Sequence, residues 1–437
     1  MARRTLSSEL PARRAGETVT LAGWVHRVRN FGGLRFLILR DRAGLAQVVI
    51  PRTLDIGDVN CEHVVSVDGT VRAEPRAPGG VEVAATSLTP ISRAETPPIE
   101  IFKPVEAEAN RLDTLLDHRA VSLRVPEVLD VFRVQAEIVR AFRSHLNSLS
   151  FTEIFTPKLV LAGAEGGSAL FEVNYYDRKA YLAQSPQFYK QMMVGSGLER
   201  VFEVGHAYRA EKSETSRHLT EFVSLDFEMG FIESEQDVMR VLSGTIAAIF
   251  NALRSNCAPI LAKRKIELPE LSDQTLPQID YLEAARILKD QFNKTDGLEG
   301  DLDTEGERLI GEWAMKEHNS PLIFVTGYAT ERRPAYAMPV AGTSNPTLTH
   351  SFDLLYHGVE IVTGGQRIHD HAQLVASFTS RGLNPASLEG YFESFKHGMP
   401  PHGGMGMGLE RLTKQLLNLG NVKEACLFPR DRNRLVP

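Results

Sequence analysis

Arginine and aromatic residues gather in one short stretch of the chain. Arg209 and Arg217 stand on either side of a loop between two expected strands, and Phe222 follows on the second strand. A guanidinium group can donate two parallel hydrogen bonds to a phosphate, and a phenyl ring can stack on a purine base. The stretch could therefore bind a nucleotide. Taken alone, the same pattern is more typical of a surface hairpin with solvated charges.

A glycine-rich segment lies near the end of the chain. Residues 403–408 read GGMGMG, Glu410 and Arg411 follow, and a helical pattern covers Leu412–Leu419. Glycine allows the backbone to approach a ligand closely, and a helix start offers free N–H groups to an anion. By itself such a segment often marks only a tight turn between a strand and a helix.

Two carboxylates stand on opposite arms of an expected hairpin. Asp353 lies on the arm Phe352–Tyr356, and Glu360 lies on the arm Val359–Val362, with a turn at His357 and Gly358. The turn could bring both carboxylates together, and paired carboxylates commonly hold the Mg²⁺ of a nucleotide. The alternative is an ordinary pair of charges at a hairpin end.

Polar residues cluster at further expected strand ends. They are the segments Glu165–Ser168, Gln184–Gln187 and Gly364–Arg367, with Lys190. Lys190 and Arg367 are two cations that could meet one small carboxylate. The run His369–His371 is a weak metal motif, because two histidines without further ligands are more often a polar strand end.

Five short strands are expected ahead of these residues, separated by turns that contain glycine. They are Val19–Val28, Leu34–Leu39, Leu45–Ile50, His63–Val71 and Val81–Leu88. Five strands in under a hundred residues predict a small barrel such as the OB-fold, which binds oligonucleotides. We expect this domain to cover residues 1–92 and a hinge to cover residues 93–125.

The remaining residues, 126–437, form the expected second domain. Apolar residues recur at helical spacing over Pro126–Leu149, and Pro126 suits a first helical turn. Strands and helices then alternate. A polar, helix-rich stretch near 267–319 predicts a small helical insertion.

Charge is unevenly distributed along the 437 residues. The whole chain has a formal net charge of −6, but residues 1–52 carry ten arginines against three acids, a local charge of +7. The rest of the chain carries −13. This asymmetry indicates a basic module that could contact phosphates, joined to an acidic body.

Other classes of protein are excluded by composition. No apolar run approaches the ~18 residues of a membrane span, and the N-terminus lacks the apolar core of a secretory signal. The cysteines are Cys61, Cys257 and Cys426, an odd number without a Cys-x-x-Cys pair. We expect a soluble cytoplasmic protein without a disulfide framework.

Three ordered segments resemble the class II aminoacyl-tRNA synthetases. Residues Phe151–Pro157 resemble motif 1, with Ser150 where glycine is common; Arg209–Phe222 resembles motif 2, and Gly406–Arg411 resembles motif 3. The resemblance implies an α+β fold, in which an N-terminal five-stranded OB-fold β-barrel precedes an antiparallel sheet flanked by helices. It also implies a homodimer with motif 1 at the interface.

Two further segments resemble the aspartyl-tRNA synthetases of the archaeal-type branch. They are Gln184-Ser-Pro-Gln187 with Lys190, and Gly364-Gly-Gln-Arg367. The resemblance implies a ligase of translation that activates L-aspartate with ATP to aspartyl-adenylate and transfers it to tRNA. ATP would be a substrate and Mg²⁺ a cofactor.

Family roles can then be carried over position by position. The resemblance implies catalytic roles for Arg209, Glu211, Arg217 and Arg411. It implies ATP contacts from Arg209, Glu211, Arg217, His218, Leu219, Phe222, Glu360, Gly408, Leu409, Glu410 and Arg411, with Phe222 and Arg411 on either side of the adenine. It implies aspartate contacts from Glu165, Gln187, Lys190, Arg209, Thr363, Arg367 and His402, and metal contacts from Asp353, Glu360 and Thr363.

The barrel resembles the anticodon-binding domain of this branch. The implied contacts come from His26, Arg27, Arg29, Phe36, Gln47 and Pro78. In this branch, enzymes that are strict for one tRNA carry Trp at the position of His26 and Lys at the position of Pro78. Relaxed enzymes carry His and Pro at these positions, as this sequence does. Because the anticodons for aspartate and asparagine differ only in their last letter, we expect both tRNA(Asp) and tRNA(Asn) to be charged with aspartate. An amidotransferase would then act downstream.

Three alternatives stay open. One is an aspartyl-tRNA synthetase that is strictly specific for tRNA(Asp). A second is an asparaginyl-tRNA synthetase, against which Lys190 argues because a neutral amide has no use for that cation. The third is a non-catalytic tRNA-binding paralogue, against which the complete set of charged motif residues argues. No membrane partner is expected.

Overall fold

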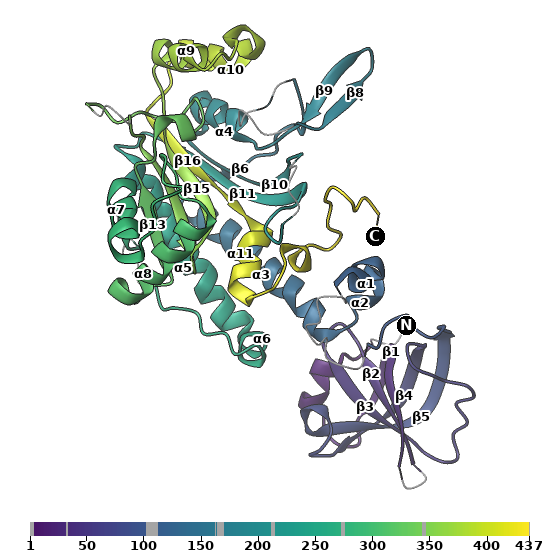
Figure 1. Cartoon of the computed structure of the whole chain (residues 1–437). Helices are drawn as coiled ribbons and strands as arrows, with labels where there is room; N and C mark the ends of the chain where they lie inside the picture. Colours follow the sequence, from purple (N-terminus) through teal and green to yellow (C-terminus); the bar gives the residue numbers. More distant parts are fainter. Residues whose placement is uncertain are drawn as a thin grey trace. The chain divides into compact units, whose positions relative to one another are not determined.

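The computed structural model describes residues 4–31, 34–101, 112–161, 163, 170–210, 215–271, 276–342 and 347–436 (Figure 1). The chain divides into two compact units, Met1–Leu129 and Asp130–Pro437. The division falls inside one long helix, a few residues after the expected start of the second domain at 126. None of the helices within these described ranges is both long and apolar enough to cross a membrane.

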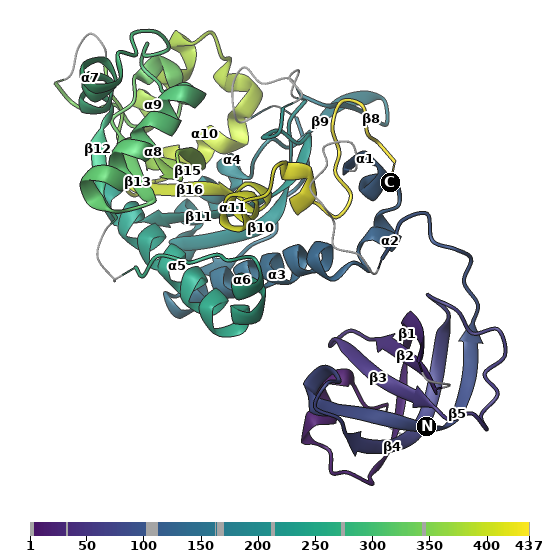
Figure 2. The same ribbon diagram turned by 60° about the horizontal axis from the view of Figure 1, so that its bottom comes forward.

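The first unit is built on a closed barrel of five strands, as expected (Figure 2). Its strands are β1 (Thr18–Phe31), β2 (Leu34–Arg40), β3 (Leu45–Ile50), β4 (Val64–Ala73) and β5 (Val81–Ser92), in the order β1-β2-β3-β5-β4. Alternate residues face inward, so that Leu37 and Leu39 of β2 and Val48 and Ile50 of β3 are buried in the barrel core.

Short helical turns complete this unit. They are η1 (Ser7–Ala12), η2 (Pro78–Gly80), α1 (Leu112–Asp117) and α2 (Arg119–Ser122). The expected hinge, residues 93–125, contains α1 and α2, and its residues 102–111 lie outside the described part of the chain.

The second unit is built on a sheet of eight strands. In spatial order they are β12 (Gln278–Asp280), β13 (Leu322–Thr326), β14 (Ser351–Tyr356), β15 (Val359–Arg367), β16 (His402–Gly408), β11 (Glu221–Gly230), β10 (Arg200–Tyr208) and β6 (Thr152–Glu153). The expected antiparallel sheet is confirmed in its centre, but the outermost pairs β12–β13 and β10–β6 are parallel. A separate sheet consists of β7 (Leu159–Val160), β9 (Arg178–Leu182) and β8 (Glu172–Tyr175).

Helices connect and cover these strands. They are α3 (Pro126–Ser148), α4 (Gln187–Met193), η4 (Val194–Leu198), α5 (Glu235–Asn256), α6 (Ala258–Lys263), α7 (Tyr281–Phe292), α8 (Thr304–His318), η5 (Thr330–Arg332), α9 (His371–Ser380), η6 (Pro385–Leu388), α10 (Glu389–Lys396), α11 (Leu409–Leu417) and η7 (Val422–Ala425). Helix α3 begins at Pro126, where a missing N–H costs no helical hydrogen bond.

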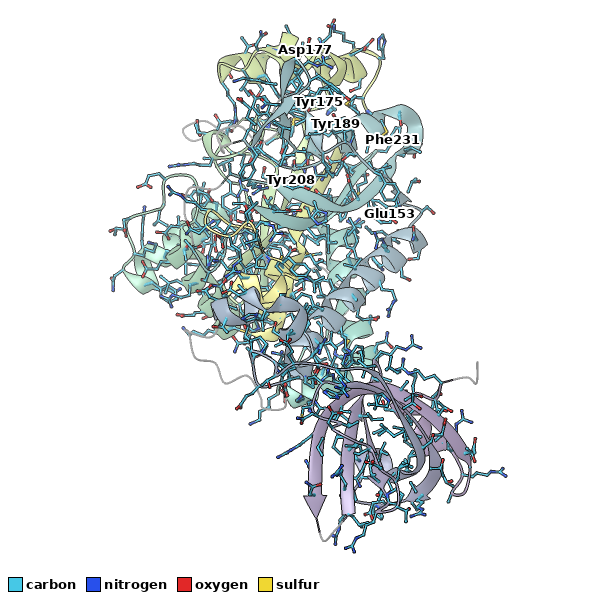
Figure 3. All side chains as sticks on the ribbon, turned by 90° about the vertical axis from the view of Figure 1, so that its right-hand side faces the viewer. Glu153, Tyr175, Asp177, Tyr189, Tyr208 and Phe231 are labelled. Carbon is cyan, nitrogen blue, oxygen red and sulfur yellow. The ribbon has the colours of Figure 1, made fainter. Side chains whose placement is uncertain are left out.

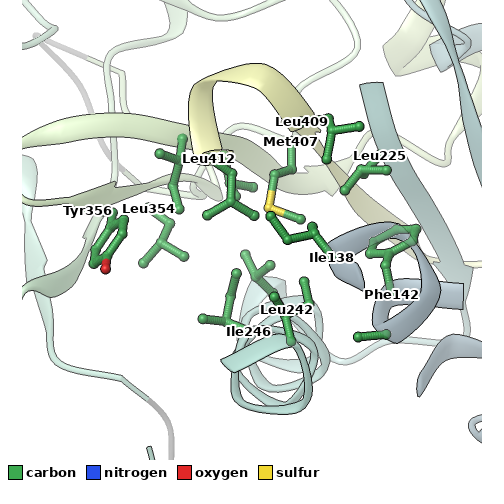
Figure 4. Close-up of a cluster of buried hydrophobic side chains, with 14 of the residues drawn as sticks. Ile138, Phe142, Leu225, Leu242, Ile246, Leu354, Tyr356, Met407, Leu409 and Leu412 are labelled. Carbon is green, nitrogen blue, oxygen red and sulfur yellow. The ribbon is translucent and has the colours of Figure 1, made fainter. Parts of the chain in front are cut away.

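One face of the large sheet carries the main hydrophobic core (Figure 4). Ile138 and Phe142 of α3 and Leu242 and Ile246 of α5 pack there with the apolar side chains of the strands. The strand residues are Leu225 and Phe227 of β11, Met405 and Met407 of β16, and Phe352 and Leu354 of β14. Because successive side chains alternate, the residues between them point to the opposite face, which is where the polar residues lie.

Two smaller apolar clusters cover parts of that opposite face. One joins α7 and α8 to the β13 edge, and it includes Leu288, Ile310 and Ile323. The other joins α4, α9 and α10, and it includes Phe188, Phe378 and Tyr391. Figure 3 shows the side chains of the unit from another side, with Tyr208 at the end of β10 and Glu153 on β6.

Two expectations about local structure need correction. The glycine-rich segment is more than a tight turn between a strand and a helix, because 402–408 forms the central strand β16, and the helix α11 begins at Leu409 rather than at 412. The stretch near 267–319 is not a purely helical insertion, because β12 joins the sheet edge. Residues 272–275 of that stretch lie outside the described part of the chain.

Candidate functional site

A pocket lies over the polar face of the large sheet, along the central strands. It is lined by Ser185, Gln187, Arg209, Arg217, His218, Leu219, Phe222, Ser224, Asp226, Arg333, Pro334, Tyr336, Ala337, Ser351, Glu360, Ile361, Thr363, Gly364, Arg367, Gly406, Gly408, Glu410, Arg411 and Val422. On β15 the pocket-lining residues run from Glu360 to Arg367, which is about 23 Å of extended chain. The site is therefore long enough for an amino acid joined to a nucleotide.

One end of the pocket carries the aromatic ring and most of the arginines. The guanidinium carbon of Arg209 lies 5.3 Å from the centre of the Phe222 ring. Glu410, buried beneath, accepts hydrogen bonds from the backbone N–H of Val223 at 3.1 Å to each oxygen, and burial raises its pKa to about 7. Arg411 donates to the backbone carbonyl of Glu360 at 3.0 Å. This end offers a stacking surface and several phosphate donors.

The other end contains two buried ion pairs. Lys190 Nζ lies 2.8 Å from Asp226 Oδ1, and Arg367 Nε lies 3.0 Å from Glu228 Oε1. Gln187 donates to Glu228 at 3.2 Å. The guanidinium of Arg367 and the Nζ of Lys190 hold the pKa of Glu228 below its ordinary value, although burial acts in the opposite direction. The two cations are therefore fixed in position by charged partners.

Asp226 has a second oxygen that is not used. Its Oδ2 is buried and has no hydrogen-bond partner among the described residues, while Oδ1 is bonded to Lys190. Asp226 lines the pocket. A buried carboxylate oxygen without a donor costs free energy, on the order of 1–3 kcal/mol. An ammonium group of a ligand would supply the missing donor.

Glycines of β16 keep this part of the site open. A Cβ atom at Gly404 would stand 2.1 Å from the carbonyl oxygen of Phe227 and 2.3 Å from Glu228 Oε2. A Cβ atom at Gly406 would stand 3.1 Å from Asp226 Oδ1. The strand must therefore lack side chains here, because Asp226 and Glu228 occupy the space.

His402 lies at the start of β16 and is completely buried. Its Nε2 accepts a hydrogen bond from Gln191 at 2.8 Å, and its Nδ1 donates to the carbonyl of Pro400 at 2.9 Å. Gln191 is in turn fixed by the hydroxyl of Tyr391 at 2.9 Å. Burial lowers the pKa of His402 to about 4, so the ring is neutral. These hydrogen bonds hold His402 in place next to Glu228 and Arg367.

Acidic residues gather between the two ends. Asp353 and Thr363 are directly paired on β14 and β15, and Glu360 lies further along β15. Glu307 of α8 accepts from Arg217 at 3.3 Å, and burial together with the neighbouring Glu360 raises its pKa to about 7. No group of three His, Cys, Asp or Glu side chains suited to a metal occurs in the described ranges. Two carboxylates and a hydroxyl nevertheless form an oxygen donor set, which Mg²⁺ prefers.

Most of the predicted ligand-binding side chains share this pocket. Lys190, Asp353, His402 and Leu409 do not form its walls; all four are buried, and Leu409 packs in the main hydrophobic core. Glu165 and Glu211, with the segment Glu165–Ser168, lie outside the described residues. Asp370 of the weak metal motif is the N-cap of α9, where its side chain accepts from Gln373 N.

Four charged residues of the site were missed by the sequence analysis. Asp226 and Glu228 alternate with apolar residues on a buried strand. Acidic residues are rarely buried without a partner, so two of them in an apolar strand were a signal that could have identified both as site residues. Arg333 and Glu307 gave no such signal, because each reaches the site from a segment without a recognisable motif.

The barrel carries a second candidate site on its outer face. Arg29 of β1 pairs with Phe36 of β2, and Arg27 pairs with Ile38. His26 is an extra residue between Val25 and Arg27, so a β-bulge interrupts the strand there. A bulge re-aims side chains next to functional sites. It turns both His26 and Arg27 outward.

A network of charges fixes the orientation of His26. Arg40 Nη1 lies 3.1 Å from His26 Nδ1, and both Arg40 and Arg124 are bonded to the buried Glu62 at 2.7 and 2.8 Å. Since a guanidinium can only donate, Nδ1 accepts and the ring proton belongs to Nε2. Burial and the charge of Arg40 lower the pKa of His26. His26 therefore presents a neutral N–H donor.

The two remaining predicted anticodon residues lie on β3 and in the turn before β5, and Gln47 pairs with Ile38, the partner of Arg27. Gln47 of β3 donates to Glu82 at 3.0 Å, and it is half-buried. Pro78 is exposed and opens η2, which leads into β5. The structure thus brings Arg27, Arg29, Phe36 and Gln47 together on one face, and Pro78 lies between β4 and β5.

Comparison with known proteins matches both units. Residues 111–432 match the family described as tRNA synthetases class II (D, K and N), and residues 19–91 match the OB-fold nucleic acid binding domain. An enzyme of Deinococcus radiodurans named aspartate–tRNA(Asp/Asn) ligase is 47% identical over 100% of this chain and 99% of its own length. One of Thermococcus kodakarensis named aspartate–tRNA(Asp) ligase is 43% identical over 100% of both chains.

A solved structure agrees with these matches. Asparaginyl-tRNA synthetase from Pyrococcus horikoshii, complexed with asparaginyl-adenylate, superimposes with a TM-score of 0.91, 30% identity and full coverage of both chains. A family model covering most of the chain and full-length relatives agree with the pocket and the barrel. The chain belongs to the class II tRNA synthetases of the aspartate, lysine and asparagine group.

Proposed function

We propose that this protein is an aspartate–tRNA ligase that activates L-aspartate with ATP and transfers it to tRNA. The observation that carries the proposal is the pair of fixed buried cations, Lys190 and Arg367, at the end of the pocket opposite Phe222. The printed names of the full-length relatives support the same amino acid. The second candidate function is that of an asparaginyl-tRNA synthetase, because a solved structure with that name has a similar fold.

The amino-acid end is suited to a small acidic amino acid. Arg367 lines the pocket and would donate to the side-chain carboxylate, while Lys190 behind it adds positive potential. The unused Oδ2 of Asp226 would accept from the α-amino group. Asparagine would replace the charge-assisted hydrogen bonds that a carboxylate accepts from Arg367 by weaker ones to its neutral amide. A hydrogen bond to a charged group contributes about 1.5–3 kcal/mol, so its loss favours aspartate over asparagine.

Activation of the amino acid needs no protein nucleophile. The carboxylate of aspartate would attack the α-phosphorus of ATP, and pyrophosphate would leave. Arg209 would stabilise the charge that develops on the α-phosphate, because its donors are already in position in the pocket. Phe222 and Arg411 would hold the adenine, and Arg217 would bind the terminal phosphate. Positioning of the two substrates would supply much of the rate.

Asp353, Glu360 and Thr363 would hold Mg²⁺, with oxygen donors from adjacent positions of β14 and β15. When bound, the ion would neutralise charge on the phosphates of ATP. Arg411 and Arg217 keep two of the nearby carboxylates, Glu360 and Glu307, paired with cations. The chain's own residues therefore position the donors and limit repulsion between them.

Exchange of labelled pyrophosphate into ATP tests the activation step. We expect exchange that depends on aspartate, with asparagine at least about tenfold less effective. Lys190→Gln should abolish most of the aspartate dependence, whereas the matched control Lys179→Gln, on an exposed hairpin, should keep it. Exchange driven by asparagine would support the second candidate, and no exchange with either amino acid would favour a binding protein.

We further propose that both tRNA(Asp) and tRNA(Asn) are substrates. The support is the neutral Nε2–H of His26, which is fixed by Arg40. Cytosine and uracil share the O2 acceptor but differ at N3 and at the exocyclic group. A single donor directed to O2 would accept both bases. A tryptophan and a lysine at positions 26 and 78 would offer more restrictive contacts.

Introducing tryptophan at position 26 and lysine at position 78 tests the proposed charging of both tRNAs. The double variant His26→Trp with Pro78→Lys should charge tRNA(Asp) within a few-fold of the original enzyme and should lose at least about tenfold in kcat/KM on tRNA(Asn). Arg72→Lys, an exposed change on β4, is the matched control and should leave the ratio unchanged. An equal loss on both tRNAs would contradict the proposal.

We also propose that the protein is a cytoplasmic homodimer. Exposed apolar side chains near motif 1 support the dimer: Phe155 is 82% exposed, Leu161 67% and Leu159 46%. A large exposed apolar patch commonly marks an interface. The cytoplasm is the compartment where ATP and tRNA meet. Aspartyl-tRNA(Asn), if formed, would need a tRNA-dependent amidotransferase as the next enzyme.

A further inference from the structure

One arginine outside the recognised motifs reaches into the metal-binding region. Arg333 Nη2 lies 2.5 Å from Asp353 Oδ2, and Arg333 Nη1 lies 2.9 Å from Asp353 Oδ1. The same Nη1 lies 3.0 Å from the hydroxyl of Thr363. One guanidinium group thus holds, at the same time, two of the three side chains proposed to bind Mg²⁺.

The position of Arg333 is tightly determined. Its guanidinium carbon lies 3.7 Å from the centre of the buried Tyr328 ring, and Asp301 lies 4.0 Å away. Asp353 and Asp301 raise the pKa of Arg333, so it stays charged. Its Nε is buried and has no hydrogen-bond partner in the described part of the chain. Arg333 therefore has one donor that none of the described residues uses.

Arg333 also separates Asp353 from the ligand pocket. Arg333 lines the pocket wall, whereas Asp353 is only 5% exposed and does not. A divalent ion bound to Asp353 and Thr363 would need the oxygen atoms that Arg333 now contacts. The guanidinium group and the metal ion are therefore alternatives at these oxygens.

We propose that Arg333 is a counter-ion that competes with Mg²⁺ for Asp353 and Thr363, and that it exchanges these oxygens for a phosphate oxygen of ATP. The proposal rests on the proposed function, because it takes ATP as the polyphosphate. A guanidinium fork fits a carboxylate and a phosphate equally well. Arg333 would thus be a phosphate-binding residue that no motif identified.

Two neighbouring ion pairs also join an arginine of the pocket wall to a carboxylate. Arg411 binds Glu360 at 3.2 Å, and Arg217 binds Glu307 at 3.3 Å. Each arginine occupies a carboxylate beside the metal-binding region, and each lines the same pocket. Arrival of a metal ion with its polyphosphate would let all three arginines change from carboxylate to ligand. Metal and nucleotide should consequently bind together, and metal alone should bind weakly.

Binding of Mn²⁺ alone tests the competition. The concentration of free Mn²⁺ is measured by electron paramagnetic resonance while the full-length protein is titrated without nucleotide. Arg333→Gln should bind one Mn²⁺ at least about tenfold more tightly than the original protein, since the competing cation is gone. In the matched control Arg332→Gln, the replaced side chain is exposed and donates to the carbonyl of Glu299, so the affinity for Mn²⁺ should not change. Equal affinity of Arg333→Gln and the original protein would overturn the proposal.

A second readout tests the exchange onto phosphate. With saturating Mg²⁺, Arg333→Gln should weaken binding of a non-hydrolysable ATP analogue about tenfold and leave adenosine binding within about twofold. Unchanged affinity for the ATP analogue would overturn the proposed exchange of Arg333 onto phosphate. If circular dichroism shows that Arg333→Gln does not fold, Arg333→Lys decides, because it keeps the charge but cannot span Asp353 and Thr363. It should bind Mn²⁺ at least about threefold more tightly, and equal affinity would overturn the competition.

The two proposals fail in distinguishable ways. Loss of the whole proposed function would appear as a lack of aspartate-dependent pyrophosphate exchange in the unmodified protein. The Mn²⁺ titration would still give its answer in that case, because it uses neither ATP nor an amino acid.

Discussion

Buried charges in this protein are held by partners that are distant in the sequence. Lys190 and Asp226 are 36 residues apart, and Arg367 and Glu228 are 139 residues apart. Residue types and motif spacing predicted Lys190 and Arg367 as cations of the site, but they missed Arg333. They could not predict which acids neutralise them, because those pairs depend on the order of strands in the sheet. Lys190 was therefore expected to face the ligand, whereas it lies behind Asp226.

Acid should destabilise the second unit through His402. Its pKa of about 4 in the folded protein lies below the ordinary value of 6.5, so the neutral ring is stabilised by folding. The unfolded chain binds this proton more readily, and stability is lost as the pH falls from about 6.5 towards 4. This residue alone should lower the free energy of unfolding by about 2 kcal/mol between pH 7 and pH 5.

Urea denaturation at the two pH values measures this effect. In His402→Asn, the difference in unfolding free energy between pH 7 and pH 5 should shrink by a similar amount. His206 lies on an exposed part of β10, and His206→Asn is the matched control. An unchanged pH dependence in His402→Asn would show that the buried ring is not the titrating group.

Alternation along single strands was the most predictable property at the scale of elements. The five barrel strands and the hairpin of β14 and β15 lie within a few residues of their expected bounds. The glycine-rich strand β16 was not predicted, because glycine is normally depleted in strands. Packing requires it: Asp226 and Glu228 of the neighbouring strand fill the space that side chains of β16 would need.

Adding one methyl group to β16 should therefore be damaging. A Cβ atom at Gly404 would clash with the backbone oxygen of Phe227, which cannot move without breaking the sheet. Gly404→Ala should cost about 1–3 kcal/mol and reduce aspartate binding. Gly390→Ala is the matched control, because Gly390 lies in α10 with open space around its Cβ position. Thermal denaturation and aspartate titration compare the two, and equal stability would contradict the packing argument.

The uneven charge of the chain is explained at the scale of the whole molecule. The excess of arginine in residues 1–52 lies within the barrel unit, where Arg27 and Arg29 follow the bulged His26. The acidic remainder includes the carboxylates of the pocket. Composition indicated the basic module correctly, but it could not predict the bulge at His26, which depends on the register between β1 and β2.

Association of two chains is predicted at the same scale. Phe155→Glu would place a charge in the exposed apolar patch near motif 1 and should convert the dimer to a monomer, since a buried unpaired carboxylate is costly. Leu282→Glu on α7, which is 50% exposed, should leave the dimer intact. Sedimentation equilibrium distinguishes the two outcomes. A monomeric original protein, or a dimeric Phe155→Glu, would contradict the proposed interface.

Charging of two tRNAs by one preparation of the unmodified protein tests the central claim most directly. Initial rates of aspartylation with labelled L-aspartate and ATP give kcat/KM for tRNA(Asp) and for tRNA(Asn). We predict that both tRNAs are charged and that the two values agree within about tenfold, because the Nε2–H of His26 meets an acceptor common to both bases. A preference of several hundredfold for tRNA(Asp) would contradict the relaxed anticodon site, and no aspartylation of either tRNA would contradict the account as a whole.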